Sequence, residues 1–147
     1  MGTIQKKTFQ GAWQLFTDGA SKGNPGPAGA GWILINEIEA RTIKESQFLG
    51  EATNNEAEYQ ALILGLKKAQ VLGVREIVVF LDSELLVRQI NGLYRVKNPR
   101  LLIFYRQVLD LLNKFSNYVI THIPREKNQE ADAMANEAIK RSKVQRD

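Results

Sequence analysis

Five consecutive apolar residues, Ile77 to Leu81, lie near the middle of the chain and are followed directly by Asp82. A continuous apolar run of this length is typical of a central strand that is buried on both faces of a sheet. Segments with helical period precede and follow it, over about residues 54–72 and 83–91. This arrangement predicts a mixed α/β fold.

The pattern on either side gives the order of the elements. Trp13 to Thr17 alternates apolar and polar residues as a strand does, and two more strands are predicted over 32–36 and about 40–49. The glycine- and proline-rich stretch from Gly19 to Gly31 is predicted as a turn region, so the three strands should form an antiparallel meander. The remaining expected elements are helices over 100–115 and 128–143 and a strand over 117–123. The order βββαβααβα predicts a five-stranded mixed sheet, three antiparallel strands followed by two parallel ones, flanked by helices.

The length of 147 residues suits one domain with its own hydrophobic core. We expect an N-terminal extension over 1–12 that is disordered, a single domain over 13–143 and a basic tail over 144–147. A monomer without an obligate protein partner is the expected state, since core assignment leaves no long apolar stripe exposed.

Composition excludes several kinds of site. The chain has no cysteine and one histidine, which rules out disulfides, thiolate zinc sites, cysteine nucleophiles and multi-histidine metal sites. It has no apolar run of the ~20 residues needed to cross a bilayer, and no secretory signal pattern, so a cytoplasmic protein without membrane contact is expected. The net charge of +4 permits nucleic-acid binding without demonstrating it.

Four carboxylates stand at positions from which they can converge. Asp18 follows the first predicted strand, Asp82 follows the central one, Glu58 lies just inside a helix, and Asp132 begins the last helix. Acids gathered at one edge of a sheet raise each other's pKa and are stabilised by cations, which is the chemistry of a metal-dependent phosphoryl-transfer site. Taken singly, each acid is also explained as a turn residue, a helix cap or an exposed first-turn acid.

Four sequence blocks surround these acids. They are Phe16-Thr17-Asp18-Gly19-Ala20 leading into Gly23-Asn24-Pro25-Gly26-Pro27, then Thr53-Asn54-Asn55 with Glu58, then Asp82-Ser83, and finally Asn128 with Ala131-Asp132. In order and spacing they resemble the blocks of the type 1 ribonucleases H, in the compact form without a basic protrusion, and the resemblance covers roughly residues 13 to 140.

The resemblance implies a ribonuclease H-like fold and an endoribonuclease that hydrolyses the RNA strand of RNA/DNA hybrids, leaving 5′-phosphate and 3′-hydroxyl ends. It implies that two Mg²⁺ or Mn²⁺ ions are bound, with Asp18 bridging them, Glu58 and Asp82 on the ion near the leaving group, and Asp132 on the other.

The resemblance also assigns substrate contacts. Asn24, Asn54 and Asn55 resemble the polar residues that contact the minor groove of the hybrid, where amides can donate to and accept from 2′-hydroxyls. Gly19 and Ser83 are further candidate contacts, although Gly19 is also explained by a tight turn and Asn54 by helix capping.

Three departures from the family pattern leave other functions open. His122 stands ten positions before Asp132, where many members carry a mobile catalytic histidine, but the alternation of Tyr118, Ile120 and His122 predicts a strand residue. Arg125 is an alternative near the scissile phosphate. Glu84 replaces a common glutamine, and the basic handle is absent between 91 and 98. The alternatives are a non-catalytic nucleic-acid-binding module on the same fold, or a nuclease that also accepts duplex RNA or RNA–DNA junctions.

Overall fold

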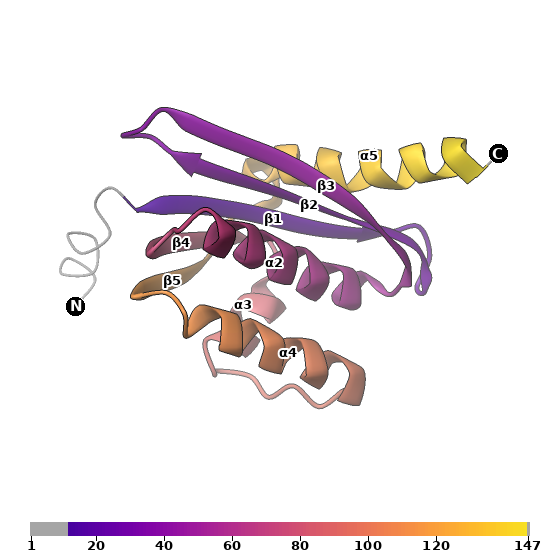
Figure 1. Ribbon diagram of the computed structural model, residues 1–147. Helices are drawn as coiled ribbons and strands as arrows, with labels where there is room; N and C mark the ends of the chain where they lie inside the picture. The colour runs from indigo at the N-terminus through magenta and orange to yellow at the C-terminus, as the bar shows by residue number, and fades with distance from the viewer. Residues whose placement is uncertain (1–11, 147) are drawn as a thin grey trace.

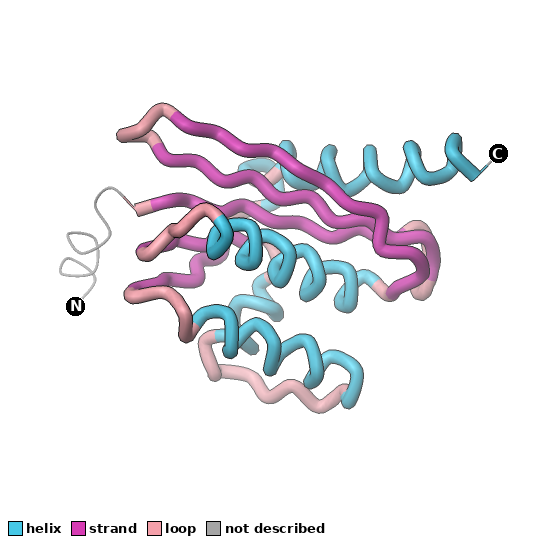
Figure 2. The backbone as a smooth tube through the Cα atoms, in the orientation of Figure 1, coloured by secondary structure: helices cyan, strands magenta, loops and turns pink. Residues whose placement is uncertain are grey.

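The computed structural model describes residues 12–146 and confirms the predicted order of strands and helices (Figures 1 and 2). One sheet has the strand order β3-β2-β1-β4-β5. Strand β1 pairs antiparallel with β2 and parallel with β4, β2 pairs antiparallel with β3, and β4 pairs parallel with β5. The element bounds are β1 Trp13–Ser21, β2 Gly26–Asn36, β3 Arg41–Ala52, α2 Asn54–Val71, β4 Glu76–Leu81, α3 Glu84–Ile90, α4 Pro99–Leu112, β5 Asn117–His122, the 3₁₀ turn η1 Arg125–Lys127 and α5 Gln129–Arg146.

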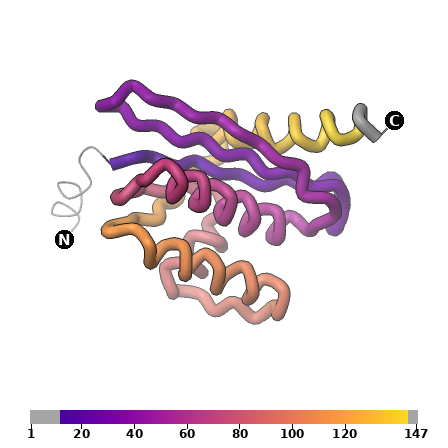
Figure 3. The backbone as a smooth tube through the Cα atoms, viewed as in Figure 1, coloured from indigo at the N-terminus to yellow at the C-terminus, as the bar shows by residue number. Residues whose placement is uncertain are grey.

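Helices cover the sheet from both sides. The ribbon shows α2, α3 and α4 together on one side, with α5 behind β1, β2 and β3 on the other (Figures 1 and 3). The stripe predicted for α2 is confirmed, because Tyr59, Leu62, Ile63, Leu66 and Ala69 are all buried. They pack on inward-facing strand residues such as Leu15, Leu34, Ile77 and Val79. The described residues include no helix that is both long enough and apolar enough to span a membrane.

The glycine-rich stretch is not the long turn that its composition predicted. Strand β1 continues to Ser21 and β2 begins at Gly26, so the turn itself covers only 22–25, and Asp18 lies within β1 opposite Gly31. A Cβ on Gly29 would lie 2.2 Å from the Ala135 carbonyl oxygen. A Cβ on Gly31 would lie 2.4 Å from the Ala131 carbonyl oxygen. These glycines therefore allow α5 to pack directly against the backbone of β2.

Two helix ends also differ from the predicted ones. Helix α4 ends at Leu112 rather than 115 because Asn113 caps it, and it begins with Asn98 as N-cap and Pro99 at the first position. Helix α5 continues to Arg146, beyond the expected end at 143. The predicted N-terminal extension lies, except for residue 12, outside the described residues, and the domain boundaries stay a prediction.

Candidate active site

Three of the four predicted acids meet at one edge of the sheet. One carboxylate oxygen from each of Asp18, Glu58 and Asp82 lies within 4.8 Å of the other two. Strands β1 and β4 are parallel neighbours, with Phe16 paired to Phe80, so each delivers an acid at the same edge two residues later. Glu58 is brought in by the first turns of α2, which approach β1 closely where Gly19 has no side chain: a Cβ there would lie 2.2 Å from the Ala57 carbonyl carbon.

The electrostatics of this cluster favour a cation. Burial, together with the neighbouring Glu58 carboxyl, raises the pKa of Asp18 from its ordinary 3.8 to about 10, and Asp82 and Asp132 act in the same direction. Burial also raises the pKa of Glu58, opposed in part by hydrogen bonds to Asp18, Gly19 and Ser83. Without a cation, the cluster therefore keeps a proton at neutral pH. A donor set made only of carboxylate oxygens is what Mg²⁺ and similar hard ions bind, so these residues fit a divalent metal.

Asp132 lies at the rim of the same site. It stands in the first turn of α5, its carboxyl interacts with that of Asp18, and it lines the cleft with the other three acids. The Asn136 side-chain amide donates to the Asp132 carbonyl oxygen at 2.9 Å and to its Oδ1 at 3.2 Å. Sequence reasoning missed Asn136. Its spacing of four residues from Asp132 on a predicted helix is the signal that could have found it.

Asn128 holds two strands together beneath the cluster. It is 2% exposed, and its Nδ2 donates at 2.9 Å to both the Thr17 carbonyl oxygen and the Asp82 Oδ2. The sequence identified Asn128 only as part of a motif, and the structure gives it a positioning role for Asp82.

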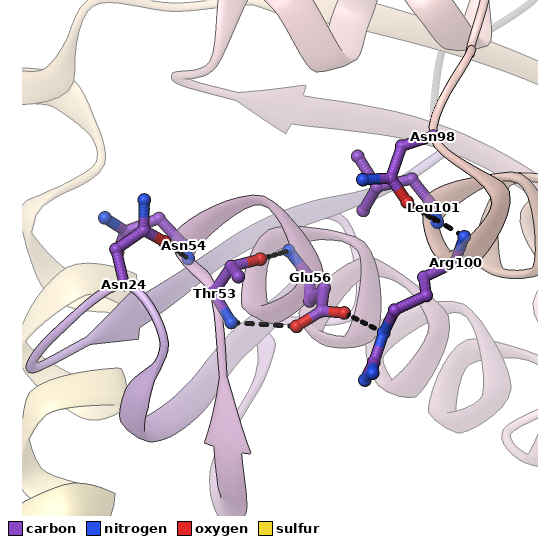
Figure 4. Close-up of polar contacts among 7 residues, drawn as sticks. All are labelled: Asn24, Thr53, Asn54, Glu56, Asn98, Arg100 and Leu101. Carbon is purple, nitrogen blue, oxygen red and sulfur yellow. Dashed lines mark hydrogen bonds and ion pairs between the residues drawn. The ribbon is translucent and has the colours of Figure 1, made fainter.

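In two of the three candidate minor-groove asparagines, the side-chain carbonyl oxygen accepts a hydrogen bond from a backbone N–H, which fixes the side chain. Asn54 Oδ1 accepts the Ser21 N–H at 3.1 Å. Asn24 Oδ1 accepts the Asn54 N–H at 3.1 Å (Figure 4). Among residues 12–146 their NH₂ groups donate no hydrogen bond, so toward a ligand both residues are hydrogen-bond donors. Asn55 is exposed and lies with Asn54 in the lining of the cleft. Asn54 is not the helix cap, because Thr53 takes that place in a capping box with Glu56.

The acids line an open cleft of about 510 Å³. Its lining comprises Asp18, Gly19, Ala20, Ser21, Lys22, Asn54, Asn55, Glu58, Asp82, Ser83, Arg125, Asp132 and Asn136. The predicted contacts Gly19, Ser83 and Arg125 are thus brought to the acids, and Ser83 also caps α3 by accepting the Leu86 N–H at 3.2 Å. His122 is the last residue of β5, as its pattern predicted; it is exposed and is not among the described residues that line the cleft.

A second cleft of about 720 Å³ adjoins the first and shares Asn54 and Asn55 with it. Across it, the mostly exposed Arg100 forms a 2.5 Å ion pair with Glu56, which links the start of α4 to the start of α2 (Figure 4). The pKa of Glu56 is lowered, mainly by the hydrogen bond from the Thr53 backbone N–H and further by the nearby Arg100, although burial acts in the opposite direction. Glu84, the residue that departs from the family pattern, pairs with Arg88 at 3.2 Å.

Comparisons with known proteins agree with this geometry. The family described as reverse transcriptase-like matches residues 16–138. The chain is 40% identical over 129 residues to ribonuclease HI from Halobacterium salinarum, covering 88% of this chain and 65% of that protein. It is 44% identical over 123 residues to bifunctional protein Rv2228c from Mycobacterium tuberculosis, covering 83% of this chain and 34% of that protein.

Solved structures extend the comparison. The crystal structure of the Halobacterium salinarum enzyme superposes with a TM-score of 0.84 at 40% identity, over 88% of this chain and 98% of that one. LC11-RNase H1, described in complex with an RNA/DNA hybrid, gives a TM-score of 0.82 at 42% identity, over 88% and 98% of the two chains.

The match over residues 16–138 defines a reverse transcriptase-like domain. Within that class, the chain belongs to the type 1 ribonuclease H family. It spans 65% and 34% of the lengths of the two curated relatives named above.

Proposed function

We propose that this protein hydrolyses the RNA strand of RNA/DNA hybrids in a reaction that depends on divalent cations, leaving 5′-phosphate and 3′-hydroxyl ends. The observation that carries the proposal is the cluster of Asp18, Glu58 and Asp82, with oxygens within 4.8 Å of one another, in a chain of this family. The relative whose structure holds an RNA/DNA hybrid supports the choice of substrate.

We assign the four acids to two Mg²⁺ or Mn²⁺ ions. Asp18, the most buried of them, would bridge the ions; Glu58 and Asp82 would complete one site, and Asp132 at the rim would complete the other. Two such ions ~3.5–4 Å apart stabilise the attacking and the leaving oxygens of a phosphodiester. The raised pKa values of Asp18 and Glu58 mean that protons leave these carboxyls when cations bind.

The other cleft residues would bind and orient the hybrid. Asn24 and Asn54 present NH₂ donors to acceptors in the minor groove. Asn55 has both amide groups available for a 2′-hydroxyl, the group that distinguishes RNA from DNA. Gly19 and Ser83 lie beside the acids.

Arg125 is better placed than His122 to contact the scissile phosphate, because Arg125 lines the cleft and His122 does not. Its guanidinium can donate two parallel hydrogen bonds to a phosphate. We therefore assign phosphate binding to Arg125 and no proton transfer to His122.

The test is cleavage of an end-labelled RNA strand paired with DNA, in Mg²⁺, in Mn²⁺ and in EDTA, beside duplex RNA, duplex DNA and an RNA–DNA junction. The proposal predicts metal-dependent cleavage of the hybrid and resistance of duplex DNA. Binding of hybrid without cleavage in either metal would establish the non-catalytic alternative. Equal cleavage of duplex RNA would establish the broader nuclease.

A further inference from the structure

Lys22 lines the same cleft as the four acids and lies between the two halves of the first sequence block. It lies in the tight turn between β1 and β2, four residues after Asp18, and its side chain is exposed. Among the residues that line the 510 Å³ cleft, Lys22 and Arg125 are the basic ones. An exposed cation in the lining of a cleft whose acids fit divalent cations matches a polyanionic ligand.

The two basic residues follow strands that lie on either side of β4 in the sheet. Lys22 follows β1, Asp82 follows β4 and Arg125 comes after β5. In the sheet, β4 lies between β1 and β5. A strand whose phosphate lies over the acids therefore passes Arg125 on one side and Lys22 on the other.

The turn that carries Lys22 is fixed by its own hydrogen bonds. The Lys22 N–H donates to the Pro27 carbonyl oxygen at 2.8 Å, and the Ser21 hydroxyl donates to the Ala52 carbonyl oxygen at 2.7 Å. The Ser21 N–H is held by Asn54, which in turn is held by Asn24. The backbone at Lys22 thus has a fixed position relative to the asparagines proposed to contact the minor groove, which limits the ordering cost of binding there.

The Lys22 ammonium is also uncommitted. Over residues 12–146, the ion pairs within 4.0 Å involve other lysines and arginines and not Lys22. No internal carboxylate has to be released before it contacts a ligand.

We propose that Lys22 binds a backbone phosphate of the strand being cleaved, next to the scissile one and on the side opposite Arg125. This inference rests on the proposed hydrolysis of hybrids. It makes Lys22 a substrate-binding residue that fixes the register of the strand over the acids, with no part in proton transfer.

The test compares Lys22→Met, Lys22→Arg and Lys114→Met for hybrid cleavage and, in EDTA, for hybrid binding by fluorescence anisotropy, each at several salt concentrations. Lys114 is an exposed lysine just before β5, at the edge of the sheet opposite the acids. Lys114→Met therefore changes the net charge by the same amount as Lys22→Met, but far from the cleft. Lys22→Met should raise KM about threefold to tenfold, leave kcat within about twofold, and reduce the salt slope by about 0.7–0.9, the value for one phosphate contact. Lys22→Arg should restore most of the affinity, and Lys114→Met should match the wild type.

Two results would overturn the assignment: a KM and salt slope for Lys22→Met equal to those of Lys114→Met, or a fall in kcat at unchanged KM. If the wild type binds hybrid but does not cleave it, the proposed hydrolysis fails. The anisotropy comparison then still decides whether Lys22 contacts the strand.

Discussion

The side-chain amide of Asn128 donates a 2.9 Å hydrogen bond to the carboxylate of Asp82, and the same nitrogen donates to the carbonyl oxygen of Thr17. One buried residue just before α5 is therefore bonded to β1, next to Asp18, and to the acid that follows β4. The spacing of the two strand-borne acids depends on this contact as well as on strand pairing.

Asn128→Ala should weaken both folding and metal binding. It leaves a buried carbonyl oxygen and a carboxylate oxygen without their donor, which costs on the order of 1–3 kcal/mol of unfolding free energy. The expected result in urea unfolding is a lower midpoint, with a higher Mg²⁺ concentration for half-maximal cleavage. Asn136→Ala is the matched control, because Asn136 is only half-buried and contacts Asp132 alone among the acids. Equal losses of unfolding free energy in Asn128→Ala and Asn136→Ala would contradict the role of Asn128 in holding β1 and Asp82 together.

The metal-free protein should lose stability as pH rises. The pKa of Asp18 is about 10 in the folded protein and near 3.8 when unfolded, so the folded state binds the extra proton. Its contribution is fully present below about pH 4 and is lost progressively as pH rises toward about 10. Thermal unfolding in EDTA should follow this trend.

Asp18→Asn removes the titrating group and should flatten the pH dependence of stability. It should also raise the melting temperature in EDTA at neutral pH, because asparagine is neutral in both states and folding no longer requires a carboxyl group to take up a proton. An equal pH slope in wild type and variant would contradict the assigned pKa.

Gly29→Ala should destabilise the protein and reduce cleavage. The new methyl group would meet the Ala135 carbonyl oxygen at 2.2 Å, so α5 must move away from β2, and α5 carries Asp132. Overpacking of this kind costs about 1–3 kcal/mol. Gly73→Ala is the control: Gly73 has φ +79° but open space around it, so its cost is backbone strain of about 1 kcal/mol without loss of activity. Unchanged cleavage by Gly29→Ala would show that α5 can shift without disturbing Asp132.

Asn54→Ala and Asn55→Ala should separate structural from substrate roles. Asn54 Oδ1 fixes the Ser21 N–H, so its removal should lower both the melting temperature and kcat/KM for the hybrid. Asn55 is exposed, and its removal should lower kcat/KM with little thermal effect. Differential scanning fluorimetry beside steady-state kinetics checks both, and a thermally destabilised Asn55→Ala variant would contradict the division.

The order of elements and the four acids could be predicted because each rests on a local signal. The apolar run before Asp82 identifies the central strand, and the helical stripe from Tyr59 to Ala69 identifies α2. The alternation fails from Gly19 to Gly31, because glycine and alanine give no apolar contrast whichever face they occupy. Strand β2 was therefore predicted to start too late.

Contacts between distant segments could not be predicted. The bonds from Asn128 to Thr17 and Asp82 join residues 111 and 46 positions apart, and no sequence period reports such distances. Asp18 was predicted as a ligand in a cluster of acids that raise each other's pKa, but burial is the largest cause of its high pKa, and only the packed structure shows that burial. Thr53 rather than Asn54 caps α2, and the sequence gives no local signal that separates these two adjacent polar residues as caps.

We propose that cations held by Asp18 and its neighbours enable cleavage of RNA paired with DNA. The most direct measurement is a denaturing gel of 5′-labelled RNA in a hybrid, incubated with wild-type protein or Asp18→Asn, with Mg²⁺ or with EDTA. We expect cleavage only by the wild type and only with Mg²⁺ (or Mn²⁺ in its place). Full cleavage by folded Asp18→Asn, or by the wild type in EDTA, would contradict it.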